Sequence, residues 1–151
     1  MGAATDISVG LASVIAGAGL GIVYNPTTAY TTSQTGIVMK SVPATPDRVV
    51  VISVIPMSDE LAAPSGEVTV QIRTRGTPNS ALDVDDLADS IKPILHGLKA
   101  QTWGSVQLVQ MFRNNAVTLG QDDSKRWERV DDYTLDVEYP ATVLVPDGGT
   151  Y

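Results

Sequence analysis

Apolar and polar residues alternate along residues 67–76, EVTVQIRTRG. One set comprises Val68, Val70, Ile72 and Thr74, and the polar set comprises Glu67, Thr69, Gln71, Arg73 and Arg75. Because successive side chains of a strand point to opposite faces, this pattern predicts a strand with one apolar and one polar face. The Gly and Pro that follow indicate where the strand ends.

Other segments have strand patterns of their own. Val49–Ile55 is a nearly continuous apolar run, which is typical of a strand buried on both faces. Residues 36–42 and 105–114 predict two further strands. The last predicted strand lies within residues 126–140, RWERVDDYTLDVEYP, where Tyr133, Leu135, Val137 and Tyr139 fall on one face, opposite Thr134, Asp136 and Glu138. The chain is therefore expected to have two strands with polar faces.

Helical spacing occurs in two segments. From residue 6 onward, apolar residues recur at Ile7, Leu11, Val14, Ile15 and Ala18, and Asp6 is a candidate N-cap. Residues 81–96 carry an apolar stripe centred on Ile91, with an acidic start that suits the helix dipole. Two helices and about five strands predict an α+β fold, with both helices on one face of a largely antiparallel sheet. We expect a single domain over residues 1–139 and an extended C-terminal segment over 140–151.

Composition excludes several kinds of site. The 151-residue chain has no cysteine and a single histidine, so thiolate and multi-histidine metal sites are not expected. A net charge of −7 makes binding to nucleic-acid phosphates a poor interpretation of this chain. Residues 7–39 carry no charge, but glycines interrupt the apolar run and no basic flank precedes it, so we expect no membrane span and a cytosolic product.

Three motifs invite a chemical interpretation. GAGLG, residues 17–21, lacks the preceding strand and the following helix of a dinucleotide loop, and is interpreted as a helix terminator. The acidic run DVDDLAD, residues 83–89, does not have the spacing of a calcium loop. His96 falls on a polar helical face, where a solvated side chain is expected. The sequence therefore predicts no catalytic residue, no metal and no cofactor.

Two charged regions remain. The segment 122–132, DDSKRWERVDD, mixes both signs, and a charged strand start is favoured over an interaction surface. Arg73 and Arg75 have two interpretations that the pattern leaves open. Their strand face is either solvated, with cross-strand ion pairs, or covered by a partner or another copy of the chain.

The order of segments resembles the minor-capsid or tail-terminator proteins of long-tailed bacteriophages, especially those of actinobacterial hosts. The resemblance covers roughly residues 6–115. It depends most on QIRTRG at residues 71–76, followed by a helix that ends in LHGL at 95–98, and on PDRVVVIS at 46–53.

This resemblance implies a non-enzymatic virion protein that forms a hexameric ring. The ring would cap the tail tube, end its polymerisation and meet a head-completion protein at the neck, while DNA passes through the pore without specific binding. Assembly would take place in the host cytoplasm. Alternatives are a head–tail adaptor, a tail-tube ring protein or a non-viral binding module. Interface residues are expected on the polar strand faces and in the C-terminal segment: Arg73, Arg75, Asp136, Glu138, Val143, Leu144 and Val145.

Overall fold

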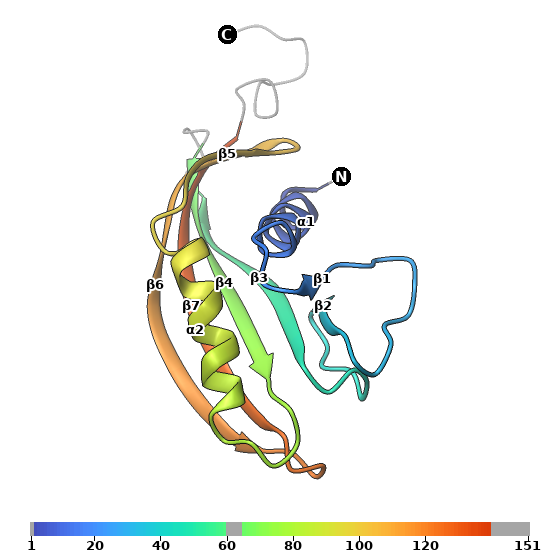
Figure 1. Ribbon diagram of the computed structural model, residues 1–151. Coiled ribbons are helices and arrows are strands. Elements are labelled where there is room, and N and C mark those ends of the chain that lie inside the picture. Colours follow the sequence, from blue (N-terminus) through green and yellow to red (C-terminus); the bar gives the residue numbers. More distant parts are fainter. Residues whose placement is uncertain (1, 60–64, 140–151) are drawn as a thin grey trace, which may run out of the picture.

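Two helices pack on one face of a curved β-sheet (Figure 1). The computed structural model describes residues 2–59 and 65–139. In this part of the chain the elements are α1 (Ala3–Ala16), β1 (Ile22–Val23), β2 (Thr35–Met39), β3 (Val49–Asp59), β4 (Ser65–Arg75), α2 (Asp83–Leu95), β5 (Lys99–Trp103), β6 (Val106–Gln121) and β7 (Trp127–Glu138). The α+β class with two helices on one face is confirmed.

The sheet is mixed, which corrects the prediction of about five largely antiparallel strands. Within the described ranges it has seven strands in the order β1-β2-β3-β4-β7-β6-β5. β2 pairs in parallel with both β1 and β3, whereas the remaining neighbours are antiparallel. The pattern missed β1, which has two residues, and β5, which is mostly exposed. Neither offers the alternation of buried and exposed positions by which a strand is recognised.

The core lies between the helices and the sheet. α2 is two residues shorter at its start than the predicted helix, but its central Ile91 is 1% exposed, as the apolar stripe predicts. In β4, the apolar set of the alternation is also buried. The largest fully buried side chains are Tyr133, Ile7, Leu11, Ile15, Ile37, Ile52, Ile72, Leu87, Ile91, Leu95, Leu108 and Met111.

Asp6 does not cap α1, contrary to the prediction. The helix begins at Ala3 with Gly2 in the N-cap position, so Asp6 lies in the first turn. Its Oδ2 accepts hydrogen bonds from the backbone N and the Oγ of Ser105 at 3.0 and 2.9 Å. At the adjacent Gly104, where φ is +58°, a Cβ would lie 2.5 Å from the Asp6 side chain. The carboxylate therefore ties α1 to the turn between β5 and β6.

The predicted C-terminal segment lies outside the described residues. Its apolar trio, Val143, Leu144 and Val145, therefore stays a sequence-based prediction, as does the division of the chain at residue 139.

Candidate functional site

The candidate functional surface is the sheet face opposite the two helices, here called the open face. β4 and β7 pair in a register that places Thr69 beside Thr134 and Glu67 beside Asp136. The intervening residues of β4 belong to the core, so these polar positions lie on the other side of the sheet. Asp136 also accepts a hydrogen bond from Gln110 of β6 at 3.0 Å. The two predicted polar faces thus form one continuous surface.

Arg73 forms an ion pair on the open face. Its Nε and Nη2 atoms both lie 2.6 Å from Oε1 of Glu128 on β7. The Arg73 side chain is 42% exposed and that of Glu128 is 11% exposed. Cross-strand pairs of this kind contribute about 0.2–1 kcal/mol to stability. Arg73 therefore has the partner within its own chain that is expected of a solvated face. The exposed part of its side chain remains accessible to a second protein.

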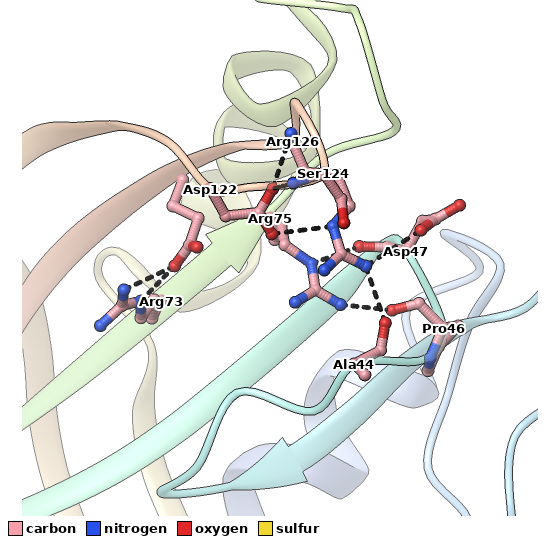
Figure 2. Close-up of polar contacts among 9 residues, drawn as sticks. Ala44, Pro46, Asp47, Arg73, Arg75, Asp122, Ser124 and Arg126 are labelled. Carbon is pink, nitrogen blue, oxygen red and sulfur yellow. Dashed lines mark hydrogen bonds and ion pairs between the residues drawn. The ribbon is translucent and has the colours of Figure 1, made fainter.

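Arg75 has a different environment, although it follows Arg73 in the same alternation. The residue is 2% exposed. Its Nε donates to the carbonyl oxygen of Asp47 at 2.8 Å and its Nη2 to that of Pro46 at 2.6 Å (Figure 2). Burial, followed by the nearby charge of Arg126, lowers the pKa of the Arg75 guanidinium. Arg75 therefore holds the loop before β3 to the end of β4. Its predicted contact with another subunit stays untested.

Arg126 reaches the same loop from the turn between β6 and β7. Its Nε donates to Oδ2 of Asp122 at 2.8 Å, and its Nη1 donates to the carbonyl oxygen of Ala44 at 2.7 Å and to Oδ1 of Asp47 at 3.0 Å. Desolvation opposes ionisation of Asp122, but hydrogen bonds from the backbone and side chain of Arg126 outweigh it and lower the pKa of Asp122. In Figure 2, the Arg75 and Arg126 side chains converge on the loop. One arginine from the end of β4 and one from the β6–β7 turn therefore hold this loop.

A third buried arginine lies on the helix side of the sheet, next to α2. The Arg129 guanidinium contacts Asp131 at 2.8 and 3.1 Å, Asp85 at 3.1 Å and Asp89 at 3.0 Å. Burial acts to lower the pKa of Arg129, but the hydrogen bonds and charge of Asp131 outweigh it and raise the pKa. Arg113 of β6 shares Asp131 at 3.3 Å. The mixed-sign segment 122–132 is therefore more than a charged strand start, because its arginines bind a loop and a helix to the sheet.

His96 is exposed at the end of α2, and its Nδ1 accepts a hydrogen bond from the backbone N of Arg113 at 3.0 Å. This contact joins the helix end to β6. Across residues 2–59 and 65–139, no group of three or more His, Asp and Glu residues could hold a metal ion. No helix within these ranges is long and apolar enough to cross a membrane.

The outer side of β6 is an open strand edge. β5 pairs with β6 only at residues 106–110, and the backbone of Met111 and Arg113 is bonded to Gly97, Leu98 and His96. Beyond this point β6 continues as the outermost strand of the described sheet, paired with β7 on its inner side alone. We call residues 114–121, NNAVTLGQ, the open edge; the segment carries no charge and no proline. Its Val117 and Leu119 are 46% and 47% exposed.

This edge was not predicted from the sequence, because the strand predicted there ends at residue 114. β6 contains register shifts between Leu108 and Gln110, Arg113 and Asn115, and Thr118 and Gly120. Each shift inserts a residue and breaks the period of two. The available signal was the stretch between Arg113 and Asp122, which carries neither charge nor proline.

The comparison with known families covers most of this fold. A family model described as bacteriophage tail terminator protein matches residues 15–139, which run from the last turn of α1 through β7. None of the curated proteins matches the chain. The match confirms the predicted resemblance and extends it beyond residue 115, whereas the narrower expectation of an actinobacterial host stays a prediction. The chain belongs to the bacteriophage tail terminator family.

Proposed function

We propose that this protein forms a closed ring, expected to be hexameric, on the end of the finished tail tube. The ring ends tube polymerisation and joins the tail to the head-completion protein. Family membership supports the structural role in the virion. The observation that carries ring formation is the open edge, because an uncharged strand edge favours pairing with another chain. Head-to-tail contacts that close on themselves cover such edges in every copy.

The open face supplies a second set of contacts in this proposal. The exposed part of Arg73, together with Asp136 and Glu138, offers both charge signs to a neighbouring subunit or to an adjacent ring. Complementary charges of this kind favour a fixed register between subunits. Arg75 is a weaker candidate for direct contact with a neighbouring subunit, because its guanidinium already donates hydrogen bonds to the carbonyl groups of residues 46 and 47.

The acidic character of the chain suits a ring that DNA crosses. A net charge of −7 repels phosphates, so DNA can pass through the pore without specific binding. Assembly in the host cytoplasm, with the tail-tube protein and the head-completion protein as partners, follows from this role.

The experiment is to delete the gene and measure tail length by negative-stain electron microscopy. We expect tubes of irregular and excessive length with unattached heads, and we expect the wild-type gene supplied in trans to restore both length and joining. Tails of normal length that fail to join heads would indicate a head–tail adaptor instead. Absence of tubes would indicate a tube subunit. Either result would contradict the terminator proposal.

A further inference from the structure

In the described part of the sheet, the unpaired edge of β3 and the open edge of β6 differ in their protection. On the β3 side, pairing with β2 ends at Ile52, and the strand then contains Pro56 and a register shift between Pro56 and Ser58. Proline and bulges are devices by which natural proteins prevent edge-to-edge association. On the β6 side, residues 114–121 include neither proline nor charge, although bulges bend the strand. Figure 1 shows β6 as a long outer border of the sheet. The open edge of β6 is therefore the better acceptor for an added strand.

We propose that residues 141–145 of one copy add as a strand to the open edge of β6 in the adjacent copy. This inference rests on the proposed ring and names one of its contacts. The segment ATVLV is uncharged, contains three β-branched residues and is bounded by Pro140 and Pro146. β-branched residues favour extended backbone, and the prolines limit the strand to this stretch. Main-chain hydrogen bonds supply affinity in such strand addition, while alternate side chains supply specificity.

The chain length places this contact between copies. The first paired residue of the open edge is Asn115, which lies opposite Asp132, whereas Glu138 lies beside Gln107 at the far end of β7. Reaching the edge from Tyr139 requires roughly 25 Å, because about seven residues of strand (about 23 Å) and two strand spacings (about 10 Å) intervene. Val145, the last residue of the segment, is six residues beyond Tyr139 and reaches only about 20–22 Å when fully extended. The strand at 141–145 therefore fits the edge of a neighbour rather than the edge of its own chain.

Side-chain chemistry agrees with this assignment. A strand on the open edge lies beside Val117 and Leu119, whose side chains are about half exposed. Val143 and Val145 share one face of the added strand, and Leu144 takes the other. Apolar side chains on the two strands then cover one another, and no charge on either strand opposes the pairing.

Cysteine cross-linking tests the contact directly, because the chain has no cysteine of its own. Phage particles are assembled in host cells that supply two variants, Val117→Cys and Val143→Cys, and the purified particles are mildly oxidised. We expect a disulfide-linked dimer that joins the two variants. The control replaces Val117→Cys with Val109→Cys, which is similarly exposed at 45% but lies where β5 already occupies the edge. We expect at least tenfold less dimer in the control.

A second pair of variants covers the case in which the cysteine variants assemble poorly. Val117→Lys should lower the yield of joined particles at least tenfold without changing the melting temperature of the purified chain, and Val109→Lys should keep the yield within twofold of the wild type. Equal cross-linking at both cysteine positions, or equal yields for both lysine variants, would overturn the inference. Rings seen on tube ends in such particles would still support the proposed function. Failure of the strand-addition contact can therefore be told apart from failure of the ring.

Discussion

Arg73 binds Glu128 at 2.6 Å between β4 and β7, on the open face of the sheet. Arg75, the next residue in the same alternation, is buried and binds the carbonyl groups of Pro46 and Asp47 instead. Two arginines that the sequence presents as equivalent therefore have separable roles, one at the surface and one in the structure of the loop before β3.

Alanine substitution should separate these roles in the free energy of unfolding. Arg75→Ala should cost about 2–3 kcal/mol, because it removes two charge-assisted hydrogen bonds and leaves carbonyl groups without their donor. Arg73→Ala should cost about 1 kcal/mol or less, since its ion pair is partly exposed. Chemical denaturation of both purified variants measures the difference. Equal losses would show that burial does not distinguish the two side chains.

Arg73 is the residue at which the role of the open face in assembly can be tested alone. Exchanging both arginines for glutamate would confuse folding with assembly, because Arg75 is buried. Arg73→Gln alone keeps a hydrogen-bond donor beside Glu128, so it should retain the wild-type melting temperature to within a few degrees and still lower the yield of joined particles by removing the positive charge. A variant with full yield would indicate that Arg73 belongs to a merely solvated part of the face.

Ile91 lies at the centre of the α2 stripe and is 1% exposed. Ile91→Ala should lower the free energy of unfolding by about 2–5 kcal/mol, because the substitution leaves a cavity under the helix. The control is Leu82→Ala, at a residue just before α2 that is 70% exposed, and it should cost less than about 0.5 kcal/mol. Similar losses for the two variants would contradict the packing of α2.

The hydroxyl group of Tyr133 is buried and has no hydrogen-bond partner in the described part of the chain. Burial, followed by the charge of Asp131, raises the pKa of this hydroxyl. Tyr133→Phe should therefore leave the free energy of unfolding unchanged or increase it, since an unsatisfied buried polar group is removed. A loss above about 1 kcal/mol in urea denaturation would reveal a partner such as a bound water.

Asp6 should contribute to acid sensitivity. Hydrogen bonds from the backbone and then the hydroxyl of Ser105 lower the pKa of the folded-state carboxyl below its ordinary value of 3.8. The unfolded chain therefore binds this proton more readily, so the stabilisation is present above the ordinary value and is lost as the pH falls through the folded-state pKa.

Melting temperatures between about pH 3 and pH 7 test this linkage. Asp6→Asn should be less stable than the wild type at neutral pH, and the difference should shrink in acid. Asp123→Asn, at an exposed residue in the turn between β6 and β7, serves as the control. A difference between Asp6→Asn and the wild type that stays constant across the range would contradict the lowered pKa.

The sequence predicted those elements whose periodicity reflects burial on one side. The alternation at residues 67–75 and the stripe around Ile91 both matched, because each element has one face in the core. Periodicity says nothing about neighbours along the sheet, however. The parallel pairing of β2 with β3 depends on the loop at residues 40–48, whose path the pattern does not encode.

The candidate site was predicted only in part. The polar face of each of the strands β4 and β7 followed from its alternation, but their pairing side by side and the different environments of Arg73 and Arg75 did not. That difference arises because the loop at residues 44–47 returns to cover the end of β4, which is a tertiary contact. The open edge was missed because three bulges in β6 disrupt the period of two.

The central claim is that copies of this chain close into a ring on the end of the tail tube. Cryo-electron microscopy of purified tail tubes, mixed with the purified chain in excess, tests it most directly. We expect one closed ring at a tube end, with no further layer and no elongation when free tube subunits are added. Stacked layers of the chain, or tubes that keep growing from a chain-bound end, would contradict it.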